Sequence, residues 1–180
     1  MTRVAIQGVS GSYSEEAARR ILGEGAAILE CSDFPSTFRA LHNGSADHAV
    51  VPVENKIVGE IAQTVELLNS NGYKILKKLS LKVQHVLAAA PGARFDDLIS
   101  VRSHVEALKQ CRNFLAANPR LMQMVGSDTA SSIRRVTNEK DLTRGAIGSR
   151  RAAEIHGAEI LRENIADDID NWTIFYLIGN

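Results

Sequence analysis

The sequence has no net charge, no long apolar run and few cysteines, and each absence removes a class of protein. Lysine and arginine together number 21, as do aspartate and glutamate, so no overall field draws the chain toward nucleic acid or an anionic membrane. No apolar run approaches the roughly 20 residues that cross a bilayer, and the N-terminal segment becomes amphipathic too early for a secretory signal. We therefore expect a cytoplasmic protein whose partner is neither a nucleic acid nor a membrane.

Signatures of metal, redox and nucleotide sites are absent as well. The two cysteines, Cys31 and Cys111, lie far apart, and no set of Cys, His, Asp and Glu has the spacing of a metal site. Segment 8–14 is followed by no Gly-Lys-Ser/Thr and lacks the third glycine of a dinucleotide fingerprint. Both cysteines are therefore expected as small buried side chains, and no metal site is expected.

What the sequence does contain is a regular alternation of short apolar runs and amphipathic stretches, with 44% hydrophobic residues to form a core. The apolar runs predict strands at 3–7, 26–30, 48–55, 98–103, 121–127, 145–149, 158–164 and 172–177. Helical spacing predicts helices over about 12–22, 34–44, 60–70, 104–115, 129–137 and 150–157. This alternation indicates an α/β protein whose sheets are covered on both faces.

A long β-rich stretch, residues 73–92, interrupts the alternation with no helix in it. Such a stretch is able to carry the chain from one lobe into another, after which strands and helices alternate again. We therefore expect two lobes, one of about 1–78 plus 166–180 and one of about 79–165. Ligands of open α/β sheets bind beyond the carboxyl ends of the strands.

Polar residues collect at those strand ends, in segments 8–16, 52–60, 101–111 and 126–133. Each segment places hydroxyls, amides and backbone N–H groups before a helix, where the helix dipole favours an anion. The same residue types are also the preferred helix N-caps, so capping alone explains any single segment. Four such segments at successive strand ends favour a small anionic ligand.

Six segments, in order along nearly the whole chain, resemble the catalytic domain of the prephenate dehydratase family. They are Gly8–Ser14, Val51–Asn55 with Gly59, Ser103-His104 with Ala107-Leu108 and Gln110-Cys111, Thr129-Ala130, Ala146-Ile147 with Ala152-Ala153, and Asn171–Phe175. The resemblance implies a two-lobed α/β fold like that of type II periplasmic binding proteins, with the active site in the cleft between the lobes. It also implies a homodimer or a larger homo-oligomer, and decarboxylating dehydration of prephenate to phenylpyruvate without a cofactor.

The resemblance also implies roles for individual residues. Thr173 is the expected proton donor to the departing hydroxyl, and neutral partners such as Asn55 and Gln110 are expected to polarise it. Glu54 is expected to orient its neighbours, because a bare carboxylate repels a dianion. The other expected substrate-binding residues are Gly11, Ser12, Lys56, Ser103, His104, Thr129, Ala130, Asn171 and Phe175.

The sequence departs from the family pattern at three places. Ile174 replaces the arginine of the Thr-Arg-Phe motif, Lys56 replaces a serine, and Val105 replaces a proline. If the arginine faces the dianion, its loss weakens charge-assisted binding, and we expect Lys56 to supply the missing charge unless it points to solvent. Lys is a point charge, so a bidentate contact with a carboxylate would not survive the exchange.

Two alternatives share most of these motifs. An arogenate dehydratase differs only in its substrate, and an impaired family member acting as a small-anion binding module would keep the motifs without turnover. A decarboxylase that retains the hydroxyl is disfavoured, because Thr173 is present. The sequence contains no amino-acid-sensing domain after residue 180, so we expect no feedback inhibition by phenylalanine through this chain.

Overall fold

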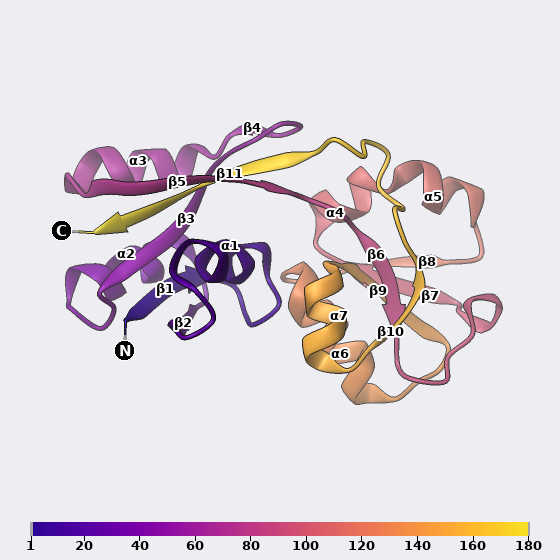
Figure 1. Ribbon diagram of the computed structural model, residues 1–180. Helices are drawn as coiled ribbons and strands as arrows, with labels where there is room; N and C mark the ends of the chain where they lie inside the picture. The colour runs from indigo at the N-terminus through magenta and orange to yellow at the C-terminus, as the bar shows by residue number, and fades with distance from the viewer. Residues whose placement is uncertain (1, 180) are drawn as a thin grey trace. The chain divides into compact units, whose positions relative to one another are not determined.

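Residues 2–179 are described by a computed structural model, in which the chain divides into two α/β units (Figure 1). Unit 1 runs to Val83 and resumes at Asn171, and unit 2 extends from Gln84 to Asp170. The boundaries expected from the sequence, near residues 78 and 166, lie a few residues before the two boundaries in the structure. The expected α/β class is confirmed in each unit.

Unit 1 is built around one mixed sheet with the strand order β2-β1-β3-β11-β5, and β4 pairs with β3. Its strands are β1 (Arg3–Gln7), β2 (Ala27–Cys31), β3 (His48–Asn55), β4 (Gly59–Glu60), β5 (Lys74–Lys82) and β11 (Trp172–Gly179). Its helices are α1 (Tyr13–Leu22), α2 (Phe34–His42) and α3 (Ala62–Asn71). The terminal strand β11 lies between β3 and β5, antiparallel to both, so the end of the chain occupies an interior place in the sheet (Figure 1).

Helices cover both faces of this sheet, as the apolar strands predict. Phe175 and Leu177 pack in the core beneath α1, with Val50 of β3. Ile174 and Ile178 belong to the core on the other face, against α2 and α3. Because side chains alternate along a strand, β11 directs Thr173 toward the face that α1 covers.

A β-bulge in β3 changes which side chains of that strand face which way. Ile174 pairs with Glu54 and Phe175 pairs with Pro52, so Val53 is an extra residue in β3. A bulge of this kind re-aims the side chains that follow it. As a result Glu54 shares the α3 face with Ile174, and Asn55 turns to the face of its cross-strand partner Thr173.

Unit 2 is built around a second mixed sheet, with the strand order β10-β6-β9-β7-β8. Its strands are β6 (Val86–Ala89), β7 (Ser100–Ser103), β8 (Met122–Val125), β9 (Arg144–Gly148) and β10 (Glu159–Arg162). Its helices are the 3-10 turn η1 (Phe95–Asp97) and α4 (Val105–Gln110), α5 (Arg112–Ala117), α6 (Thr129–Glu139) and α7 (Arg150–His156). Strand β7 is parallel to β8 and β9, whereas β6 is antiparallel to β9 and β10.

The helix expected over 104–115 is broken at Cys111, where the backbone leaves helical geometry with φ −112° and ψ 25°. Ala107, Leu108, Cys111 and Leu115, which lie at helical spacing, are all buried. The two short helices therefore share one apolar face, but the expected single continuous helix is wrong. Burial raises the pKa of the Cys111 thiol to about 12. Cys31 is only partly buried, and burial raises its pKa as well. Among residues 2–179, no helix is long and apolar enough to cross a bilayer.

Candidate active site

The clearest polar constellation in unit 1 joins Thr173 to Asn55 across the β3–β11 ladder. Asn55 Nδ2 donates to Thr173 Oγ1 at 2.9 Å, to Asn171 Oδ1 at 2.9 Å and to Trp172 O at 3.0 Å. Asn55 and Thr173 are each 7% exposed, and Asn171 is 1% exposed. Hydrogen bonds between groups buried from solvent are electrostatically stronger than the same bonds in water.

The turn after β3 fixes which end of the Asn55 amide meets the threonine. Asn55 Oδ1 accepts from the backbone N–H of Ile57 at 2.9 Å and of Val58 at 3.1 Å. With its oxygen held there, only the NH2 end is able to face Thr173. The threonine oxygen therefore accepts this bond, which leaves its own proton for another acceptor and makes the hydroxyl a better donor.

Asn171 was expected to bind substrate, and the structure contradicts a direct contact. Its side chain is almost fully buried, and its carboxamide oxygen accepts from Asn55. It therefore helps to hold Asn55 in place. Phe175 is a second correction, because its side chain is 2% exposed and packs in the core beneath α1.

Ile174, which replaces the motif arginine, lies on the sheet face opposite to Thr173. It pairs with Glu54 and packs against the α2 and α3 side of the sheet. An arginine at this position would extend beside the Glu54 carboxylate, so its replacement removes no cation from the face that carries Thr173. Lys56 is exposed, and its backbone N–H donates to Trp172 O at 3.0 Å. The expected contribution of Lys56 to substrate binding stays a prediction.

The polar segment 8–16 forms the N-terminal cap of α1. Ser12 Oγ accepts from Glu15 N at 3.2 Å, which makes Ser12 the N-cap of α1. Gly11 N donates to Glu15 Oε2 at 3.1 Å, and Ser12 N donates to Val9 O at 3.0 Å. The backbone N–H groups of Gly11 and Ser12 thus have internal acceptors, and the expectation that these residues hold a substrate carboxylate stays a prediction.

The buried ion pair behind this cap was missed by sequence reasoning. Glu15 is 1% exposed, and its Oε1 lies 2.7 Å from Arg19 Nε. The sequence does contain a pattern that predicts this ion pair, since Ser12-x-x-Glu15 is the capping-box pattern and Glu15–Arg19 is an i,i+4 pair. The pair stiffens the first turns of α1.

In unit 2, two of the expected substrate-binding residues have structural roles. Ser103 is 0% exposed, and its Oγ donates to Ile147 O at 2.7 Å, which contradicts direct substrate binding by this hydroxyl. His104 is the N-cap of α4, because its Nδ1 accepts from Glu106 N at 3.2 Å. His104 is partly exposed as a residue.

Thr129 and Ala130 form the first two positions of α6, after the N-cap Asp128. Asp128 Oδ1 accepts from Ser131 N at 2.7 Å. The first N–H groups of a helix have no intrahelical acceptor, so those of Thr129 and Ala130 remain suited to an anion. The Ala130 side chain is fully buried, and only its backbone is able to serve a ligand.

Gln110 ends α4, and its Oε1 lies 2.9 Å from His85 Nε2. His85 is 3% exposed, and its burial lowers the pKa of the ring, an effect that the bond to Gln110 partly offsets. Sequence reasoning placed His85 only in an apolar stretch and missed this contact. No local pattern signals it, because 25 residues separate the two partners.

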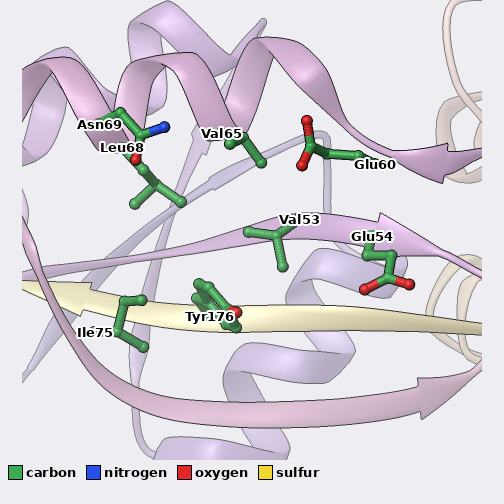
Figure 2. A pocket seen from close by; sticks show the side chains of 8 residues that line it. All are labelled: Val53, Glu54, Glu60, Val65, Leu68, Asn69, Ile75 and Tyr176. Carbon is green, nitrogen blue, oxygen red and sulfur yellow. The ribbon is translucent and has the colours of Figure 1, made fainter.

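A hollow of about 480 Å³ in unit 1 lies between α3 and the sheet. Figure 2 shows Glu54 and Glu60 at one end of it, with Val65 and Leu68 of α3 opposite Tyr176. Glu54 and Glu60 are direct cross-strand partners in β3 and β4. This hollow is on the α3 face, opposite to the Thr173–Asn55 pair. Two carboxylates and, among the described residues, no cation line it, so it does not suit a dianion.

Comparisons with known sequences give a consistent result. A profile described as prephenate dehydratase matches residues 4–180. "Arogenate dehydratase/prephenate dehydratase 1, chloroplastic" of Arabidopsis thaliana is 36% identical over 98% of this chain and 45% of its own length. "Arogenate dehydratase/prephenate dehydratase 6, chloroplastic" of the same plant is 38% identical over 98% and 43%. The chain thus spans less than half the length of these curated relatives.

Solved structures share the fold over almost the whole chain. A prephenate dehydratase in complex with L-Phe from Arthrobacter aurescens has a TM-score of 0.89 and 26% identity over 99% of this chain and 60% of that one. A protein described as GqqA, a novel type of quorum quenching acylase, has a TM-score of 0.87 and 32% identity over 99% and 64%. The same fold therefore carries two differently described activities, and the site has to decide between them.

Proposed function

Because the chain belongs to the prephenate dehydratase family, we propose that it carries the site that converts prephenate to phenylpyruvate. The observation that carries this proposal is the hydrogen bond from Asn55 Nδ2 to Thr173 Oγ1. Because the threonine oxygen accepts this bond, the hydroxyl becomes a better donor of its proton to a departing oxygen. An acylase would instead need a nucleophile beside a base, and the buried Ser103 hydroxyl donates to a backbone carbonyl.

The reaction needs a donor because hydroxide is a poor leaving group. As the bond between the ring and its carboxylate breaks, the electron pair enters the ring, the ring C–O pair leaves with the oxygen, and CO₂ and water are released. Thr173 shares its proton with the departing oxygen, and solvent then returns a proton to it. Asn55 stabilises the charge that develops on Oγ1 during this transfer, and one such donor accounts for about 10²–10³ in rate.

We assign each residue of the proposed mechanism one role. Thr173 is the proton donor, and Asn55 polarises it through Nδ2. The N–H groups at the start of α6 and the NH2 of Gln110 are the proposed anion-binding donors of unit 2, because the reacting species is a dianion and each of these groups only donates. No metal or organic cofactor is assigned a step.

The finer substrate assignment is also part of this proposal. The relatives named above are described as dehydratases of prephenate or of both arogenate and prephenate. Prephenate is our proposed substrate, and arogenate is the alternative. A cytoplasmic location and assembly into a homodimer or a larger homo-oligomer remain proposals that rest on the family resemblance.

A substrate comparison tests the proposal. The protein is mixed with prephenate or with arogenate at neutral pH, and the phenylpyruvate or phenylalanine formed is measured against the spontaneous rate. We expect phenylpyruvate above that rate, with a higher kcat/KM for prephenate. Faster turnover of arogenate would assign the alternative substrate. Binding of prephenate by calorimetry without turnover would identify a binding module and reject the enzyme.

A further inference from the structure

The buried His85 and the partly buried Gln110 form a pair in unit 2, and the chemistry of the carboxamide determines which partner donates. A carboxamide oxygen accepts hydrogen bonds and never donates them. Since His85 Nε2 lies 2.9 Å from Gln110 Oε1, that nitrogen has to carry the proton. Burial lowers the pKa of His85, so the ring is neutral near pH 7 and its single proton is the one given to Gln110.

The backbones of the two residues are tied to the same segment of chain. Ile165 N donates to His85 O at 3.3 Å, and Asp167 N donates to Gln110 O at 2.7 Å. The two side chains therefore meet on main-chain positions that residues 165–167 hold together. Gln110 is at the end of α4, where a side chain without such support samples several rotamers.

The contact decides which end of the Gln110 amide faces His85. With Oε1 held by His85, the amide cannot rotate by half a turn without breaking a partly buried hydrogen bond. Its NH2 end is then directed away from His85. Asn55 in unit 1 is held in the same manner, because its Oδ1 is fixed by the N–H groups of Ile57 and Val58. Each unit thus holds one carboxamide by its oxygen.

We propose that His85 is a positioning residue that keeps Gln110 oriented as a hydrogen-bond donor for the dianionic substrate. The inference rests on the proposed function and adds to it a residue whose imidazole Nε2 lies 2.9 Å from Gln110 Oε1. An anion is repelled by a carbonyl oxygen and attracted by an N–H, so a misoriented amide would oppose binding and turnover. A preoriented donor avoids reorganisation at the moment of reaction.

A set of variants separates positioning from a merely structural role. His85→Leu fills the space without a donor, whereas His85→Gln brings an N–H donor to the place of the imidazole Nε2. We expect kcat/KM for prephenate to fall at least about tenfold in His85→Leu and to recover to within about threefold of the parent in His85→Gln. In the Gln110→Ala background, His85→Leu should lower kcat/KM no further. An equal loss in that background, or no loss in the parent, would overturn the inference.

A spectroscopic measurement keeps this inference distinguishable from the proposed function. Nitrogen-15 NMR of the imidazole reports the tautomer, and we expect a neutral ring protonated at Nε2 whose N–H resonance moves in Gln110→Ala. A resonance that does not move, or a ring protonated at Nδ1, would show that His85 does not hold Gln110. A parent without turnover but with the expected resonance would instead reject the proposed function and, with it, the catalytic consequence of the pair.

Discussion

Asn55 connects the proton donor to the backbone turn that follows β3. Its nitrogen reaches Thr173, Asn171 and the carbonyl of Trp172, and its oxygen receives two backbone N–H groups. The side chain is therefore fixed at both ends, and its donor end is the one that meets the threonine. Because the threonine accepts this bond, the negative charge that appears on its oxygen during turnover is already compensated.

Asn55→Asp tests this polarity at constant size. A carboxylate keeps the two contacts with Ile57 and Val58 but replaces the N–H donor, so Thr173 would donate its proton inward and away from the substrate. We expect kcat/KM for prephenate to fall at least about hundredfold. Steady-state assays of the folded variant, with its melting temperature measured in parallel, provide the check.

Asn43→Asp is a matched control for that change. Asn43 is exposed in unit 1, and its Oδ1 accepts from Ser45 N, a contact that an aspartate keeps. It adds the same charge without touching Thr173, so activity should stay within about twofold of the parent, as expected of a screened surface charge. Equal losses in both variants would mean that charge alone, and not the lost donor, explains the effect.

The resemblance to the family led us to expect Asn55 as a partner of Thr173, and it also assigned substrate contacts to residues that have structural roles. Ser12 and His104 are helix N-caps, and Ser103 and Phe175 are buried. The sequence could not separate these cases, because capping and anion binding use the same side chains at the same place before a helix. Burial is decided by tertiary packing, which a motif does not encode.

At the scale of elements, the alternation of apolar runs predicted nearly every strand and helix, and it failed where the backbone departs from regularity. Strict alternation along β3 would place Glu54, and not Asn55, on the face of Thr173. The bulge at Val53 reverses this, and it depends on pairing with β11, more than 110 residues away. The break at Cys111 was equally hidden, since the apolar spacing continues through it.

Gly148 permits the close approach of α6 to β9. A Cβ built there would lie 2.6 Å from Ile133 Cδ1 and 3.1 Å from Thr129 O. Thr129 is the first residue of α6, the proposed anion-binding helix. We expect Gly148→Ala to lower the free energy of unfolding by about 1–3 kcal/mol through overpacking. Urea denaturation monitored by circular dichroism measures the change.

Two further variants test whether the clash between the new Cβ and Ile133 causes the loss of stability in Gly148→Ala. Adding Ile133→Val removes the Cδ1 atom and should recover part of the lost stability. Gly25→Ala has no heavy atom within 4 Å of the new Cβ, so it should change stability by less than about 0.5 kcal/mol. A Gly148→Ala protein as stable as the parent would show that the strand and helix adjust freely.

At the scale of the whole molecule, each unit has its own sheet and its own hydrophobic core. Composition and periodicity predicted this organisation because both depend on local pattern and on the total apolar content. The buried His85 was not predicted, and it links the stability of the molecule to pH. Burial holds the pKa of this ring below its ordinary value, so the unfolded chain binds a proton more readily than the folded one.

The parent protein should therefore lose stability as the pH falls below about 6.5, the ordinary pKa of histidine. The loss from this group amounts to about 1.4 kcal/mol for each pH unit until the lowered pKa of the folded state is reached. His85→Gln has no ring to protonate, so its stability should depend less on pH in this window. Urea unfolding at several pH values compares the two proteins. If the free energy of unfolding depended on pH equally in the two proteins, this result would contradict a buried, neutral His85.

The most direct test of the account is the turnover of prephenate by Thr173→Val and Thr173→Ser. Valine keeps the shape of threonine without the hydroxyl, and Asn55 retains its bonds to Asn171 and Trp172, so the site should stay folded. We predict that kcat falls at least about hundredfold in Thr173→Val and stays within about tenfold of the parent in Thr173→Ser. A valine variant that forms phenylpyruvate as fast as the parent would contradict the central claim that this hydroxyl donates the proton.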